Sequence, residues 1–257
     1  LATLKKQLQP DVGLYFVNDH LISSTYTIFY NFCFDDKDAT CYSNDGIQGL
    51  FPLSSKLGSE LGAQIAVIES VTNVLPARQV YDIVASPPKA SSYTRGDVKA
   101  DTYFRSLYEV DTPFPISCAL TSLLIAGNFM CYFIDSLSNL THETAFKAAY
   151  VTLYNITQLL RDLRNYSARD GLLSQVANQR IDAILRDDTL KMLRHKKEEF
   201  RNILVHYSFT ERSKAHVPAS KLDLDAPLCG IIGLFFPYSS LEELSSLTFA
   251  QLKRVTR

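Results

Sequence analysis

The stretch AFKAAYVTLYNITQLLRDLRNY (residues 145–166) decides the expected fold, because its apolar residues recur at the spacing of an amphipathic helix. Thr141 stands shortly before it and is a candidate N-cap for this helix. The same spacing appears in residues 116–137, 172–185 and 189–207. Long helices with short connections pack together as bundles, so residues 111–257 are predicted to form a helical bundle.

Capping and turn signals separate these helices. Residues 167–171 form a short connection that ends in glycine, a residue that stops helices. Asp187 or Asp188 is placed to cap the helix that follows, and Ser239 or Ser240 is placed to cap a last helix near the C-terminus. The final LKRVTR breaks off within a helical pattern, so we expect the natural chain to extend further.

Residues 1–110 differ in character and are predicted to form a separate, irregular region of mixed structure. Residues 25–34 alternate polar and apolar positions and favour a strand, whereas residues 53–73 favour a helix. Residues 86–98 (SPPKASSYTRGDV) are rich in serine and contain a Pro-Pro pair, which is typical of a linker. The sequence leaves the role of this region open.

The composition of 46% hydrophobic and 21% charged residues is typical of a soluble globular protein. The net charge of −1 gives no global signal for nucleic-acid binding, so any such surface has to be a local patch. The five cysteines include no CxxC pair and the histidines show no ligand spacing, so we expect neither a metal nor a cofactor. Reduced thiols and the lack of an apolar run after Lys5 and Lys6 indicate a cytoplasmic protein.

Residues 112–134 carry no charge and raise the question of a membrane span, which needs about 20 mostly apolar residues. Polar or small residues interrupt the apolar run at Thr121, Ser122, Gly127 and Asn128. A buried core helix is therefore the favoured interpretation, and a membrane-associated protein is the weaker alternative.

The segment KMLRHKKEEFRNILVHYSF (residues 191–209) carries the candidate chemistry. Its apolar face on an ideal helix consists of Leu193, Phe200, Ile203, Leu204 and Tyr207. The opposite stripe consists of His195, Glu198, Glu199, Asn202 and His206. Arg201 lies on the flank of that stripe, roughly 140° from His206 around the helix axis.

A histidine and an arginine in one site suit phosphate-ester chemistry. The imidazole of His206 can transfer protons near neutral pH, and Asn202, one turn earlier, is placed to orient it. The guanidinium of Arg201 fits phosphate oxygens and stabilises charge that develops on them. The basic residues expected to contact RNA around this site are Arg194, Lys197, Arg212 and Lys214.

The motif RNILVH (residues 201–206) has the spacing Arg-Asn-x-x-x-His and resembles the signature of HEPN-superfamily ribonucleases. The resemblance covers the C-terminal half of the chain and implies an HEPN-like helical bundle that usually forms a homodimer. It also implies metal-independent RNA cleavage, in which a ribose 2′-hydroxyl attacks the adjacent phosphate. His206 would then be the general acid/base, Arg201 the phosphate ligand and Asn202 a supporting residue. Many members of the family act as toxins or antiphage effectors, which implies an antitoxin or regulatory partner.

Two other interpretations remain open. The bundle could be a non-catalytic HEPN-like domain that binds RNA, a nucleotide or a protein partner. His206 could then simply lie at a helix C-terminus, where a positive charge is favoured. In that case its replacement by alanine would leave the protein's activity intact.

Overall fold

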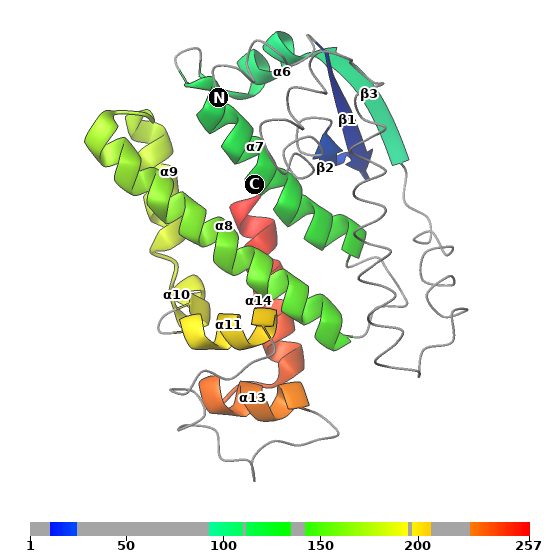
Figure 1. Cartoon of the computed structure of the whole chain (residues 1–257), viewed down its shortest axis with the longest axis vertical. Helices are drawn as coiled ribbons and strands as arrows, with labels where there is room; N and C mark the ends of the chain where they lie inside the picture. The colour runs from blue at the N-terminus through cyan, green and yellow to red at the C-terminus, as the bar shows by residue number, and fades with distance from the viewer. Residues whose placement is uncertain (1–10, 25–92, 110–111, 135–141, 195–196, 207–226) are drawn as a thin grey trace. The chain divides into compact units, whose positions relative to one another are not determined.

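The computed structural model describes residues 11–24, 93–109, 112–134, 142–194, 197–206 and 227–257 (Figure 1). The chain divides into two compact units, Leu1–Val110 and Asp111–Arg257. Most of the described residues are helical, and a small antiparallel sheet belongs to the first unit. The expectation of a mainly α chain is therefore confirmed at this level.

The first unit contains a three-stranded antiparallel sheet with the order β2-β1-β3. The strands are β1 (Asp11–Val17), β2 (His20–Ser24) and β3 (Tyr93–Lys99), and helix α6 (Ala100–Leu107) follows β3 directly. Asn18 and Asp19 form the two-residue loop between β1 and β2, with φ angles of 48° and 63°. Asparagine and aspartate tolerate this left-handed backbone, which matches the twist of a tight hairpin.

Two expectations for this unit need correction. The described residues form regular strands and a helix, so the prediction of an irregular region is wrong for them. The predicted linker 86–98 is wrong from Tyr93 onward, because these residues pair with β1 along its whole length and gain a full ladder of backbone hydrogen bonds. The strand expected at 25–34 and the helix expected at 53–73 lie outside the described residues.

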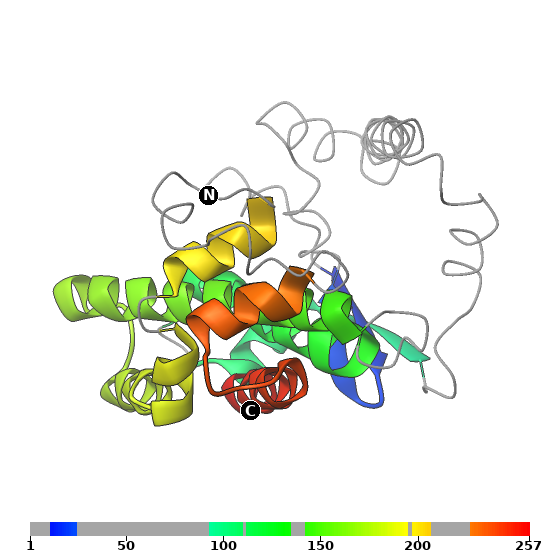
Figure 2. The same ribbon diagram turned by 90° about the horizontal axis from the view of Figure 1, so that it is seen from below.

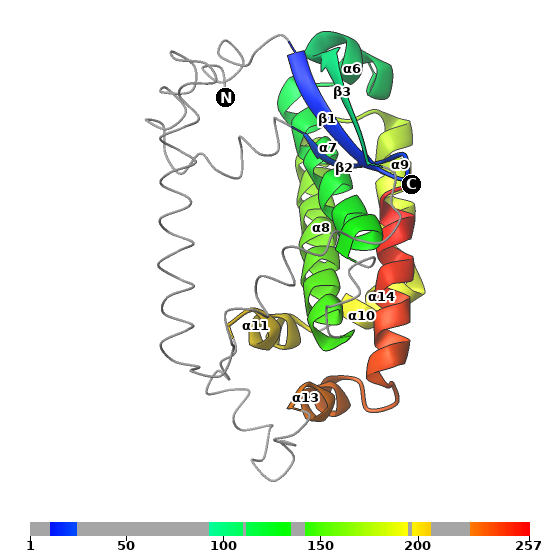
Figure 3. The ribbon, with the colours of Figure 1, turned by 90° about the vertical axis from the view of Figure 1, so that its right-hand side faces the viewer.

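The second unit is a set of packed helices. They are α7 (Phe114–Asn128), the π-helix η2 (Phe129–Phe133), α8 (His142–Asp170), α9 (Gln175–Leu185), α10 (Asp188–Arg194), α11 (Glu198–His206), α13 (Pro227–Phe235) and α14 (Leu241–Val255). Helices α8 and α14 run side by side along the unit, and α11 and α13 lie across one end of it (Figure 3). Seen from below, α11 and α13 lie next to each other (Figure 2), joined by contact between Phe200 and Phe235.

Most helix ends follow the expected signals. Gly171, with φ of +64°, ends helix α8 as expected. The predicted connection 167–171 is wrong for residues 167–170, because α8 continues to Asp170. The hydroxyl of Ser240 accepts a hydrogen bond from the backbone N–H of Glu243 and so caps α14. The expected cap at Thr141 lies outside the described residues. Among the described residues, the largest departure from expectation is 189–207, which is two helices, α10 and α11.

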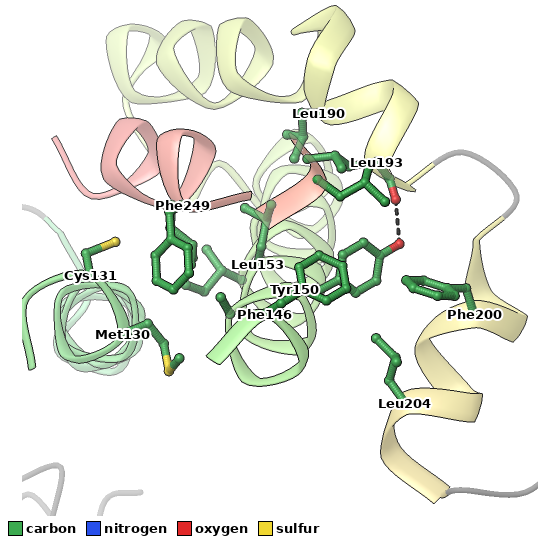
Figure 4. Packing of buried hydrophobic residues seen from close by; sticks show 14 of the residues in the cluster. Met130, Cys131, Phe146, Tyr150, Leu153, Leu190, Leu193, Phe200, Leu204 and Phe249 are labelled. Carbon is green, nitrogen blue, oxygen red and sulfur yellow. Dashed lines mark hydrogen bonds between the residues drawn. The ribbon is translucent and has the colours of Figure 1, made fainter. Parts of the chain in front are cut away.

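The core of this unit is apolar and rich in aromatic side chains (Figure 4). Its largest fully buried members are Phe146, Tyr150, Leu153, Leu193, Phe200, Leu228, Leu244 and Leu252. Tyr150 and Phe200 meet edge to face at 4.9 Å between ring centroids, and Phe236 meets Phe200 in the same way at 5.2 Å. Each such pair adds about 0.5–1.5 kcal/mol beyond the burial of its surface.

The uncharged helical segment Ile116–Phe133 is, by length and composition alone, long and apolar enough to cross a membrane. It nevertheless packs in the bundle: Met130 and Cys131 belong to the core, and α7 contacts both α8 and α14. Gly127 allows one of these contacts, since a Cβ atom there would lie 2.3 Å from Cγ2 of Thr256. The glycine is therefore required for the close approach of the C-terminal end of α14 to α7.

We expect Gly127→Ala to destabilise the protein, because the clash with Thr256 outweighs the gain in helix propensity of about 1 kcal/mol. Thr256→Ser removes Cγ2 but keeps the hydroxyl that bonds to the carbonyl of Leu252. The double variant should recover most of the lost free energy of unfolding, measured by urea denaturation. Equal losses in the single and double variants would contradict the proposed contact.

Asp187 connects the start of α10 to α14. Its carboxylate accepts hydrogen bonds from the backbone N–H of Leu190 at 2.9 Å, from Gln251 at 2.9 Å and from the guanidinium of Arg254. Burial alone would raise the pKa of Asp187, but the bonds from Leu190 and Arg254 lower it overall. The carboxylate is thus more stable as an anion in the folded protein than in the unfolded chain.

The lowered pKa of Asp187 determines how its contribution to the unfolding free energy changes with pH. Its stabilising contribution is present above the ordinary aspartate pKa of about 3.9 and is lost as acidification protonates the folded protein. We expect Asp187→Asn to lose on the order of 1 kcal/mol of unfolding free energy at neutral pH, with the difference vanishing in acid. Asp188→Asn, at a side chain that is 96% exposed, is the matched control and should cost little. A deficit of Asp187→Asn that is constant with pH would contradict this assignment.

Candidate active site on helix α11

The break between α10 and α11 positions the candidate site. Lys197 is not helical: its N–H bonds to the carbonyl of Arg194 at 3.1 Å, and its own carbonyl accepts the N–H of Arg201 at 3.0 Å. The prediction of one continuous helix over 189–207 is therefore wrong. The physical reason is tertiary, because Phe200 has to reach the aromatic core and the carbonyl of Leu193 finds a donor outside its own helix.

That donor is the hydroxyl of Tyr150, which bonds to the carbonyl oxygen of Leu193 at 2.5 Å (Figure 4). Tyr150 is only 2% exposed. Its burial, and secondarily the nearby Tyr154, raise its pKa well above the ordinary value, whereas Arg194 acts in the opposite direction. The hydroxyl consequently remains protonated and can donate this bond.

Arg201 lies in the first turns of α11 and faces α8. Its Nη1 donates to the side-chain oxygen of the adjacent Asn202 at 3.0 Å, and its Nη2 donates to the side-chain oxygen of Asn155 at 3.4 Å. Its Nε is buried and has no hydrogen-bond partner among the described residues. The structure thus joins two of the three motif residues, Arg201 and Asn202, and adds Asn155 from α8.

No described carboxylate forms an ion pair with Arg201, although Glu198 stands one turn earlier on the same helix. Its two bonded neighbours are amides, which orient a guanidinium without neutralising its charge. A half-buried arginine of this kind can accept a phosphate oxygen as its counter-charge.

His206 is the last residue of α11. Its backbone therefore lies at the end of the same short helix as Arg201, and the orientation of its side chain lies outside what the structure describes. Among the described residues, no group of three or more His, Cys, Asp or Glu is placed to hold a metal ion.

The four expected RNA contacts are placed differently from one another. Arg194 is 9% exposed and lies inside the unit, with its guanidinium 4.5 Å from the ring centroid of Tyr154. The ammonium of Lys197 donates to the carbonyl of Phe235 and lies 4.3 Å from the ring centroid of Phe236. Burial lowers the pKa of Lys197. Arg212 and Lys214 lie outside the described residues.

Sequence reasoning did not identify the partners that α8 supplies. Asn155 stands in an Asn-x-Thr sequence, which does not point to a contact with Arg201, and Tyr154 and Gln158 carry no motif at all. Their spacing on α8 is the only available signal, since residues three to four apart share a helix face. Knowing that this face meets α10 and α11 requires the tertiary structure.

No protein-family model, no curated protein and no solved structure matches this chain.

Tyr150→Phe tests the bond that holds the break between the two helices. The variant keeps the aromatic ring but leaves the buried carbonyl of Leu193 without its donor, so we expect a loss of about 1–3 kcal/mol of unfolding free energy. Tyr238→Phe, at a side chain that is 96% exposed, should change nothing. Equal stability of the two variants in urea denaturation would show that the carbonyl is satisfied in another way.

Proposed function

We propose that the chain is a metal-independent RNA endonuclease of the HEPN type, with Arg201, Asn202 and His206 as its active-site motif. The observation that supports this proposal best is the environment of Arg201. Its guanidinium is held by the amide oxygens of Asn202 and Asn155 and has no described carboxylate partner. A structural arginine that is half buried usually pairs with an acid, whereas a phosphate ligand keeps its charge available.

In the proposed reaction the ribose 2′-oxygen attacks the adjacent phosphorus, and the bond from phosphorus to the 5′-oxygen of the next nucleotide breaks. His206 accepts the proton of the 2′-hydroxyl and supplies a proton to the departing 5′-oxygen. Arg201 binds the non-bridging phosphate oxygens and stabilises their charge in the transition state. The products carry a 2′,3′-cyclic phosphate and a 5′-hydroxyl, and no metal or cofactor takes part.

The proposal extends to the protein's setting. Two copies of the motif across a homodimer would form the complete site, and RNA would be the substrate. We propose a cytoplasmic toxin or antiphage effector, controlled by an antitoxin or another regulatory partner. These parts rest on the resemblance of RNILVH to the family motif and on the helical unit that carries it.

We expect purified protein to cleave total RNA or a tRNA pool in EDTA, leaving 2′,3′-cyclic phosphate ends. Arg201→Ala and His206→Ala should each slow cleavage by about 10²-fold or more, the range for loss of a general acid/base or an oxyanion ligand. Arg201→Lys keeps the charge but loses the fork of donors, and should stay well below the parent.

Arg180→Ala provides the matched control, because Arg180 is an exposed residue of α9 at the other end of the unit from α11 (Figure 1). It should cleave like the parent. Equal cleavage by all variants, or none by the parent with any RNA, would instead favour a non-catalytic bundle that binds RNA, a nucleotide or a protein partner.

A further inference from the structure

A second polar site lies beside the break between α10 and α11. It is a cavity of about 270 Å³. Its lining combines residues of α8, α9, α10 and the start of α11: Tyr154, Arg161, Leu185, Leu190, Lys191, Arg194, Lys197 and Glu198. Pockets for small ligands begin at about 300 Å³, so this volume suits a small molecule or group rather than a polymer. Arg201 is not among the lining residues.

The charge of the lining is strongly unbalanced. Four cationic side chains and one carboxylate, Glu198, surround the cavity. Lys191 pairs with Asp188 at 2.9 Å, and the ammonium of Lys197 bonds to a backbone carbonyl. Arg161 forms no hydrogen bond or ion pair with any described residue. Positive charge inside a partly enclosed cavity attracts anions more strongly than the same charge in open solvent.

Arg194 is the buried member of this group. Its Nη2 donates to the side-chain oxygen of Gln158 at 3.0 Å, and its guanidinium stacks on Tyr154. Its Nε is buried and has no hydrogen-bond partner among the described residues. Burial, followed by repulsion from Arg161, lowers the pKa of Arg194 overall, although Tyr154 and Tyr150 act in the opposite direction. A buried cation with an unused donor and a like charge beside it becomes more stable when an anion occupies the adjacent space.

We propose that this cavity binds the phosphate group of a small phosphorylated molecule, held by the guanidinium groups of Arg194 and Arg161. Guanidinium presents donors in a planar fork that fits phosphate oxygens, and the surplus of positive charge suits a group that carries up to two negative charges. The site does not depend on RNA cleavage, because none of the motif residues Arg201, Asn202 and His206 lines it.

The direct test titrates the full chain with inorganic phosphate at constant ionic strength, set with sodium chloride. Isothermal titration calorimetry of Arg201→Ala, which lacks the proposed phosphate ligand of the active site, should show saturable binding with one site per chain, and phosphate should raise its unfolding temperature. Succinate, a dianion of different geometry, should bind at least about tenfold more weakly, since its two carboxylates are separate centres whereas one phosphate presents several oxygens to both guanidinium groups at once. Equal effects of phosphate, succinate and chloride would overturn the proposal.

We expect Arg161→Ala to change the unfolding temperature and the phosphate affinity in opposite directions. It removes repulsion on Arg194, so the protein without ligand should unfold at the same or a higher temperature than the parent. It also removes one of the two guanidinium groups that hold the phosphate. The phosphate affinity should therefore fall about tenfold or more, the scale of a lost charged hydrogen bond. Arg180→Ala removes an equal charge from the exposed face of α9 and should leave phosphate binding unchanged. Unchanged binding by Arg161→Ala would overturn the proposal.

Two further comparisons identify which kind of molecule carries the phosphate group that the cavity binds. Adenosine 5′-monophosphate is compared with adenosine, and a 5′-phosphorylated oligoribonucleotide is compared with its 5′-hydroxyl form. Displacement of bound phosphate by the nucleotide alone assigns a free nucleotide, and displacement by the 5′-phosphorylated RNA assigns an RNA terminus. Displacement by adenosine or by the 5′-hydroxyl RNA as effectively as by their phosphorylated forms would count against phosphate recognition. Arg201→Ala should keep the phosphate binding that Arg161→Ala loses, because Arg201 does not line the cavity, so loss of cleavage and loss of binding at the cavity remain separate results.

Discussion

The hydrogen bond from the Tyr150 hydroxyl to the carbonyl of Leu193 is the constraint on which the arrangement of the second unit depends. A helix that ends inside a core leaves carbonyl groups without partners, and each unsatisfied group costs about 1–3 kcal/mol. Tyr150 supplies the missing donor at the end of α10, so the chain can turn there and begin α11 in a new direction. Phe200 then packs against the same tyrosine ring, so one side chain of α8 both ends one helix and positions the next.

Two arginines near this turn, the buried Arg194 and the half-buried Arg201, have similar surroundings. Arg194 is oriented by the amide oxygen of Gln158, and Arg201 by those of Asn202 and Asn155. In both cases Nε is buried without a partner among the described residues. Amides fix the direction of a guanidinium but leave its full charge in place, whereas a carboxylate would cancel it. The same region therefore holds two oriented positive charges, and we propose an anion as the partner of each.

Helical periodicity and caps could be predicted from the sequence because they depend on residues close together along the chain. The glycine stop at Gly171 and the cap at Ser240 are of this kind. The division of residues 189–207 could not be predicted, since its apolar spacing is continuous and the cause is a tyrosine 43 positions away. The contact between Asn155 and Arg201 could not be predicted either, because the two residues are 46 positions apart in the sequence. The hairpin at Asn18 and Asp19 did carry a local signal, two turn-forming residues between apolar runs, and could have been recognised.

The break also bears on how the motif could act. Helix α11 has only nine residues, with Arg201 in its first turns and His206 at its end. Five positions along an ideal helix correspond to about 7.5 Å of axial rise and roughly 140° of rotation. In the proposed reaction, the general acid/base His206 and the phosphate ligand Arg201 have to contact the same phosphate group, each within about 3 Å of the oxygen on which it acts. A rigid α11 in one chain separates these groups. In the enzyme proposed above, a two-fold pairing of chains would let the arginine of one copy act with the histidine of the other, and distortion at the end of α11 is the alternative. The rotation between the two positions is the physical reason for proposing a catalytic site built from two copies.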